Sequence, residues 1–113
     1  MIVKNPTLLK QMHEMIHSCE WPAGCKLRGF PLELAHIRAK GMGGGFRMDT
    51  PENLVMLCRE HHRMFDQSIG QGASARAEML EAARSRPEWL VDALGDCDKR
   101  FRIESGKANR LDS

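Results

Sequence analysis

Two pairs of potential metal ligands stand out in the 113-residue chain. Cys19 and Cys25 bracket a turn-rich stretch, and Cys58 and His61 have the spacing Cys-x-x-His. Thiolate and imidazole groups in two such pairs are typical of a tetrahedral structural zinc site, which forms when folding brings the pairs together. The alternative is that the cysteines are small buried hydrophobic residues. The Cys-x-x-His spacing favours zinc, and Cys97 is then a spare thiol with a packing role.

Further polar residues lie around the second pair in a defined order. The stretch Glu33-Leu-Ala-His36-Ile-Arg is followed by a glycine-rich loop and then by Glu52-Asn53-Leu-Val-Met-Leu-Cys58-Arg-Glu-His61-His62. This order of His, Asn and His, with Asn-Leu-x-x-Leu-Cys ahead of a helix, resembles the HNH (ββα-metal) endonuclease family. The resemblance covers about residues 19–66.

The resemblance implies a role for each of these residues. His36 would be the general base, because a neutral imidazole can take a proton from water at neutral pH. Asn53 would orient His36 by holding the loop or the imidazole ring. His62 would bind a divalent metal such as Mg²⁺, Mn²⁺, Ni²⁺ or Zn²⁺, which would polarise the scissile phosphate. Asp66, one helical turn later, is a candidate second ligand.

Position 35 departs from the family pattern. Family members usually carry a metal-binding Asp or His immediately before the base, and this chain has Ala35 there. Glu33 shares a strand face with position 35 and is a candidate substitute. Taken singly, His36, Asn53 and His62 each have an ordinary structural explanation, but their joint order and spacing favour a site.

Basic residues flank the glycine-rich loop. Arg38, Lys40 and Arg47 are predicted to bind DNA phosphates. The alternative is a solvated loop with no ligand.

These residues need particular elements to position them. Asn5 followed by Pro6 predicts a helix start, and apolar spacing extends that helix over about residues 6–17. Two strands are expected, and the sequence places them at residues 30–39 and 54–57, with a loop between them and a helix from about residue 59.

The C-terminal third is expected to be helical at first and then irregular. Two helices are predicted over about residues 73–95, with Gly95 as the stop signal of the second. The buried stripe of that helix is predicted to consist of Trp89, Leu90, Ala93 and Leu94. Residues 99–113 are predicted to form a polar basic tail.

Charge is distributed unevenly, although the net charge is only +2. Residues 26–63 contain seven Lys/Arg against four Asp/Glu, and residues 64–98 contain three against seven. A basic middle beside an acidic stretch fits a surface that faces a polyanion, although ordinary surface scatter explains it equally well. The sequence contains no apolar run long enough for a membrane span and no apolar signal core, so a cytoplasmic protein is expected.

The sequence therefore predicts one α+β domain over residues 1–113, in which a small zinc-stapled ββα-metal core carries flanking helices. The predicted function is metal-dependent hydrolysis of DNA phosphodiester bonds, by nicking. An alternative is a non-catalytic, zinc-dependent nucleic-acid-binding module whose metal site is degenerate at Ala35. A zinc-stabilised protein-interaction domain is a third class, which leaves His36, Asn53 and His62 unexplained.

Overall fold

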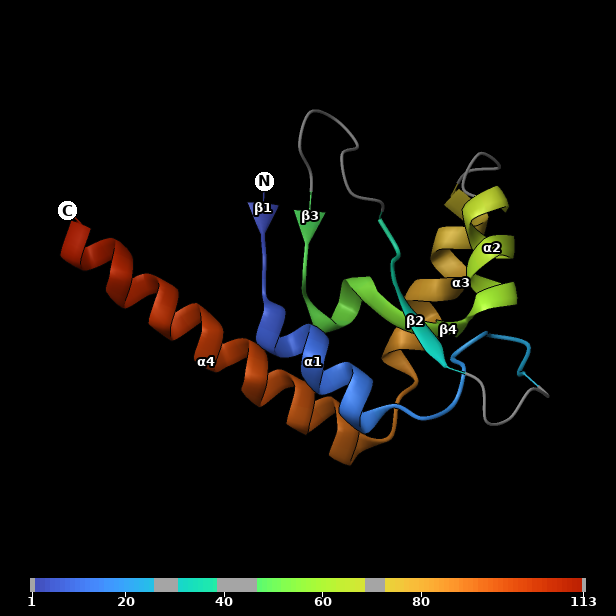
Figure 1. Ribbon diagram of the computed structural model, residues 1–113, viewed down its shortest axis with the longest axis horizontal. Helices are drawn as coiled ribbons and strands as arrows, with labels where there is room; N and C mark the ends of the chain where they lie inside the picture. The colour runs from blue at the N-terminus through green and yellow to red at the C-terminus, as the bar shows by residue number, and fades with distance from the viewer. Residues whose placement is uncertain (1, 26–30, 39–46, 69–72, 113) are drawn as a thin grey trace.

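The computed structural model describes residues 2–25, 31–38, 47–68 and 73–112, and these form an α+β protein (Figure 1). The strands are β1 (Ile2–Val3), β2 (Leu32–His36), β3 (Arg47–Met48) and β4 (Leu54–Cys58). The helices are α1 (Pro6–Met15), the 3₁₀ helix η1 (Pro51–Asn53), α2 (Arg59–Ser68), α3 (Ala73–Arg84) and α4 (Glu88–Asp112). The predicted α+β class is confirmed. No helix in the described part of the chain is both long enough and apolar enough to cross a membrane.

Helix α1 begins where the sequence predicts. The Asn5 side chain caps it by accepting a hydrogen bond from the Leu8 backbone N–H at 3.1 Å, and Pro6 occupies the first helical position. The helix ends at Met15, two residues before the predicted end.

The two predicted central strands form an antiparallel pair. Leu32 of β2 lies opposite Cys58 of β4, and His36 lies opposite Leu54. Helix α2 follows β4 directly, so the chain runs strand, strand, helix over the segment that carries the candidate site. The short strand β2 lies inside the predicted 30–39 range, and β4 extends the predicted 54–57 range by one residue.

The strand pair is covered by helices on both faces. Leu54 and Met56 of β4 pack in one cluster with α1 and α4, whereas Val55 and Leu57 pack in another with α2 and α3. Figure 1 shows α1 and α4 lying side by side, with α2 and α3 grouped at the opposite end of the view. Because β4 is buried on both faces, its sequence is a continuous apolar run rather than an alternating one.

A second pair of strands was not predicted. β1 and β3 pair in parallel, with Ile2 opposite Arg47 and Val3 opposite Met48. The Asp49 backbone N–H continues this connection by donating to the Val3 carbonyl oxygen at 2.8 Å. The start of the chain is therefore joined to the segment that precedes η1.

Helix α4 differs from its prediction in two respects. Trp89 is 61% exposed, whereas Leu90 and Leu94 are buried as predicted, with Cys97 packed beside them. These positions follow i, i+4, i+7 spacing, which turns Trp89 about 100° away from α1. Gly95 does not end the helix, which continues to Asp112 through most of the predicted tail.

Gly95 sits inside α4 because nothing at this position requires a left-handed backbone. A Cβ atom added there would meet nothing within 4 Å, and its φ is not positive. We expect Gly95→Ala to raise the free energy of unfolding by about 0.5–1 kcal/mol, since glycine in a helix interior costs that much relative to alanine. Urea unfolding followed by circular dichroism measures the change.

Gly24 supplies a matched control for this substitution. A Cβ atom there also meets nothing within 4 Å, but the backbone has a φ of +87°. Gly24→Ala should therefore destabilise the protein through backbone strain alone, by about 1–2 kcal/mol. Equal changes in stability for the two variants would contradict the assignment of Gly95 to an unstrained helix.

Candidate functional site

The four predicted zinc ligands lie together in the structure. The ligand atoms of Cys19, Cys25, Cys58 and His61 are all within 4.8 Å of one another. The His61 Nδ1 atom is 3.3 Å from the sulfur of Cys19 and 3.3 Å from that of Cys58, and the Cys25 and Cys58 sulfurs are 4.0 Å apart. Cys58 ends β4 and His61 lies in the first turn of α2, while the Trp21–Gly24 turn, closed by a 2.8 Å hydrogen bond, separates the other two.

The geometry of this cluster fits a tetrahedral ion. Zinc at about 2.3 Å from sulfur and about 2.0 Å from nitrogen places neighbouring ligand atoms about 3.5–3.8 Å apart. The observed spacings of 3.3 and 4.0 Å lie on either side of that range. The Cys58 backbone N–H points at the Cys19 sulfur and the His61 N–H at the Cys58 sulfur, which favours the thiolate form that binds metal.

The surroundings of the cluster are partly buried. Burial raises the pKa of the Cys19 thiol to about 11, despite backbone N–H groups that lower it. A metal must therefore displace this proton to bind. The Trp21 ring stacks on His61 with ring centroids 4.6 Å apart and planes 4° from parallel, which fixes the imidazole orientation. The sequence reasoning assigned Trp21 no role, although its place between two ligand cysteines was a signal.

A second group of polar side chains lies beside this cluster in an open pocket. Glu33, His62 and Asp66 line the pocket together with Arg59 and Arg63. Helix α2 contributes five residues to the lining, of which Glu60 is one. The other four have i, i+3, i+4, i+7 spacing, which places them on one face of the helix. The sequence reasoning missed Arg59 and Arg63, although this spacing was available to it.

The second group offers two ligand atoms for a divalent ion. The His62 Nδ1 atom is 2.8 Å from a Glu33 carboxylate oxygen, and His62 Nε2 is 3.8 Å from an Asp66 oxygen. Ligand atoms about 2.1 Å from one ion lie at most about 4.2 Å apart, so an ion fits between Nε2 and Asp66. Glu33 then holds the other ring nitrogen, as carboxylates commonly do for metal-binding histidines.

Position 35 cannot take part in this group. Ala35 is 3% exposed and packs with Val55, Leu57 and Phe65 between the strand pair and helices α2 and α3. Glu33, the candidate substitute for a ligand at position 35, contacts the His62 imidazole nitrogen.

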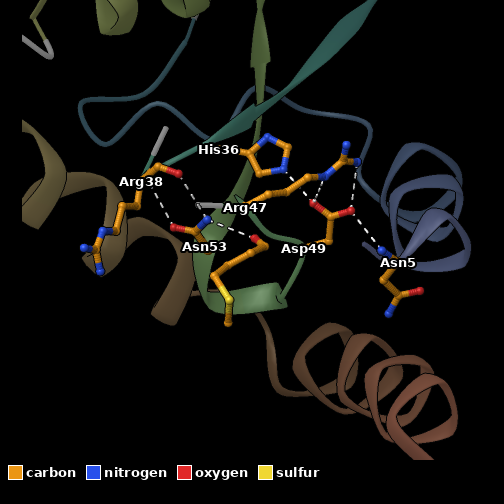
Figure 2. Close-up of polar contacts among 7 residues, drawn as sticks. Asn5, His36, Arg38, Arg47, Asp49 and Asn53 are labelled. Atoms are coloured by element: carbon orange, nitrogen blue, oxygen red, sulfur yellow. Dashed lines mark hydrogen bonds and ion pairs between the residues drawn. The ribbon is translucent and has the colours of Figure 1, made fainter. Parts of the chain in front are cut away.

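A third group surrounds His36 (Figure 2). Its Nε2 atom is 2.7 Å from a carboxylate oxygen of Asp49, a residue that is fully buried. Arg47 donates to both oxygens of that carboxylate, at 3.1 and 3.0 Å. The predicted phosphate ligand Arg47 thus has a carboxylate partner instead. Asp49 itself was missed, because a charged residue after a glycine-rich loop gives no sequence signal of burial.

Residues 15–69 match the profile of a family described as HNH endonuclease. Over these residues the chain is similar to HNH endonucleases. The match brackets the core predicted at about residues 19–66. Comparison with curated proteins and with solved structures gave no match.

Within the HNH segment, Asn53 holds the loop rather than the imidazole. Its side-chain oxygen accepts from the Arg38 backbone N–H at 2.9 Å, and its amide donates to the Met48 carbonyl oxygen at 2.9 Å (Figure 2). Asn53 thereby ties the backbone just after β2 to the end of β3. Arg38 is exposed at this junction, and Lys40 lies outside the described residues.

The HNH residues fall on two faces of the strand pair. Alternation along β2 puts His36 on the face covered by α1 and α4, and Glu33 on the face covered by α2 and α3. His62 contacts Glu33 and Asp66, so His62 and Asp66 lie on the same face of the strand pair as Glu33. The predicted base and the predicted metal ligands therefore form separate groups at the same strand.

Proposed function

We propose that this protein is a metal-dependent endonuclease that hydrolyses DNA phosphodiester bonds by nicking one strand. The observation that carries the proposal is the pocket in which the ligand atoms of His62 and Asp66 lie beside Arg59 and Arg63. The similarity of residues 15–69 to HNH endonucleases supports it. On this proposal, β2, β4 and α2 are the ββα-metal core.

Each side chain has a defined task in the proposed reaction. His62 Nε2 and Asp66 hold the divalent ion, and Glu33 accepts the Nδ1 proton of His62 and fixes the ring. The ion, when bound, polarises the scissile phosphate and stabilises the leaving oxygen. Arg59 and Arg63 bind the neighbouring phosphates. His36 takes a proton from the attacking water.

The two faces of β2 constrain where the phosphate lies. In the described residues β2 pairs only with β4, so its other edge carries no partner strand there. We place the scissile phosphate along that edge, since groups from both faces of a strand can reach a ligand at its edge. Asn53 contributes by holding the backbone just beyond His36 in place.

The Cys19, Cys25, Cys58 and His61 cluster is proposed to hold a structural zinc ion. Its four protein ligands complete a tetrahedral set, which is the pattern of structural rather than catalytic sites. The ion would fasten the segment before β2 to the start of α2, and so support the helix that carries His62.

Nicking of supercoiled plasmid DNA tests the proposal. We expect relaxed circular product when Mg²⁺, Mn²⁺, Ni²⁺ or Zn²⁺ is added, and none when the protein carries only its tightly held ion. Dependence on added metal is the decisive feature, because the His62–Asp66 pair offers too few protein ligands to retain an ion tightly.

The buried Ala35 favours one alternative, a non-catalytic zinc-dependent module that binds nucleic acid. That module would bind DNA with an affinity that falls steeply with added salt, through phosphate contacts that ignore sequence. Salt-dependent binding with no nicking in any metal would establish the alternative and end the nuclease proposal.

A further inference from the structure

The carboxylate of Asp49 has an unusually complete set of partners. One oxygen contacts His36 Nε2 at 2.7 Å and Arg47 Nε at 3.1 Å. The other accepts from Arg47 Nη2 at 3.0 Å and from the Asn5 backbone N–H at 2.9 Å. A carboxylate has about four lone-pair positions, so all of them are used. The partners come from β2, β3 and the start of α1 (Figure 2).

This arrangement keeps Asp49 charged in spite of its burial. Burial alone would raise its pKa, but the hydrogen bonds from Arg47, His36 and the Asn5 N–H outweigh burial and lower the pKa to about 2. At neutral pH Asp49 is therefore an acceptor only. The short contact with His36 then requires the proton of the neutral ring to reside on Nε2, which leaves Nδ1 without one.

A purely structural explanation accounts for only part of this geometry. Arg47 and the Asn5 N–H already neutralise the carboxylate and join the start of α1 to β3. The bond to His36 adds nothing to that junction, yet it is the shortest of the four. The His36 side chain is 7% exposed, so its orientation is set by this bond and by packing.

We infer that Asp49 is the positioning residue of His36, holding the Nε2–H tautomer so that Nδ1 is the atom that accepts a proton from water. The role of His36 as a base rests on the proposed function, whereas the orientation of its ring rests on the contacts of Asp49. The inference assigns to Asp49 the ring orientation that the sequence had assigned to Asn53.

The proton transfer is balanced within this group. An O–H bond of the attacking water breaks and an Nδ1–H bond forms, while the water oxygen bonds to phosphorus. The bond from phosphorus to the leaving oxygen breaks, and that oxygen takes a proton from solvent. The imidazolium so formed lies beside the negative charge of Asp49, which stabilises it. Arg47 is the other charged group bonded to this carboxylate.

Nitrogen NMR of the histidine rings tests the inference without any need for catalysis. The chain has five histidines, and the His36 signals are identified as those lost in His36→Gln. We expect wild-type His36 to be the Nε2–H tautomer at neutral pH, and Asp49→Asn to change the ring-nitrogen chemical shifts of His36. The control Asp92→Asn, on the exposed side of α4, should leave His36 unchanged.

Kinetics with the same variants test the role in the reaction. Asp49→Asn should lower kcat by about a hundredfold, the lower end of what a general base contributes, with KM for DNA nearly unchanged. Asp49→Glu should restore part of the rate. Added to His36→Ala, Asp49→Asn should cause little further loss, because the two residues act as a unit.

Failure of the inference and failure of the proposed function give different results. An Nδ1–H tautomer in wild type, or His36 ring-nitrogen shifts that are the same in Asp49→Asn, would overturn the inference even if the protein nicks DNA. A protein that nicks no DNA but has the Nε2–H tautomer and the changed ring-nitrogen shifts ends the nuclease proposal and leaves the positioning intact. If Asp49→Asn does not fold, the tautomer of His36 in the wild-type protein and the nicking rate of Asp49→Glu still test the inference.

Discussion

Replacement of Cys58 by serine is expected to unfold most of the protein at room temperature. Cys58 is a buried ligand whose sulfur lies near both Cys25 and His61. Structural zinc in small domains is worth about 10–16 kcal/mol of binding free energy at neutral pH. The whole stability of a domain this size is about 5–15 kcal/mol, so the fold should not survive loss of the ion.

Elemental analysis and thermal unfolding together measure this effect. Purified wild-type protein should contain about one zinc per chain, and Cys58→Ser should contain much less and show no cooperative unfolding transition. Cys97→Ser is the matched control, because Cys97 is a partly buried cysteine of α4 that packs in the core between α1 and α4 and is not one of the four ligands. It should keep the zinc and lose little stability. Zinc-free protein with an unchanged melting transition would remove the structural ion from this account.

Short sequence patterns predicted most of the helices and strands near the candidate site. The Asn5-Pro6 start of α1, the apolar run of β4 and the Cys58-x-x-His61 spacing each act over a few residues, and each has the predicted structural outcome. Such features depend on backbone and side-chain preferences that neighbouring residues already determine.

The missed features depend on contacts between distant parts of the chain. The Asp49 carboxylate binds the Asn5 backbone across 44 residues, and two-residue strands such as β1 and β3 have no periodicity to detect. The predicted burial of Trp89 on α4 was also wrong, because the side of an amphipathic helix that is buried depends on the element packed against it. Trp89 has more apolar surface than its neighbours, yet α1 packs against Leu90 and Leu94, which are buried as predicted.

The split of the site between two faces of β2 was also inaccessible to motif reasoning. The family order places His36, Asn53 and His62 in sequence without saying which face each occupies. Because side chains alternate along a strand, Glu33 and His36 lie on opposite faces of β2. His62 contacts Glu33 at 2.8 Å and therefore lies on the Glu33 face. Residues of one motif thus contribute to two groups that differ in burial and partners.

Substitutions in these two groups should fail in different ways, which makes them the sharpest test of the proposed reaction. His36→Ala removes the proton acceptor, and loss of a general base typically costs about a hundredfold to ten-thousandfold in rate. Metal binding should persist, since His62 and Asp66 are untouched. Higher metal concentration should therefore not restore the rate.

His62→Ala should instead weaken metal binding and cleavage together. It removes the imidazole that faces Asp66 at 3.8 Å, so part of the activity should return as the metal concentration is raised. Asp66→Ala should behave as a milder version, because its side chain is 63% exposed and water can replace it as a ligand. His13→Ala, an exposed histidine on α1, is the matched control and should nick DNA at the wild-type rate.

Plasmid nicking across a metal titration, with metal affinity measured separately by calorimetry, distinguishes these outcomes. The proposed scheme requires a low plateau rate at unchanged metal affinity for His36→Ala, and a shifted metal midpoint for His62→Ala. A His36→Ala variant as fast as wild type would exclude His36 as the base. Equal metal affinity in wild type and His62→Ala would place the catalytic ion elsewhere, because no other imidazole lines the described pocket.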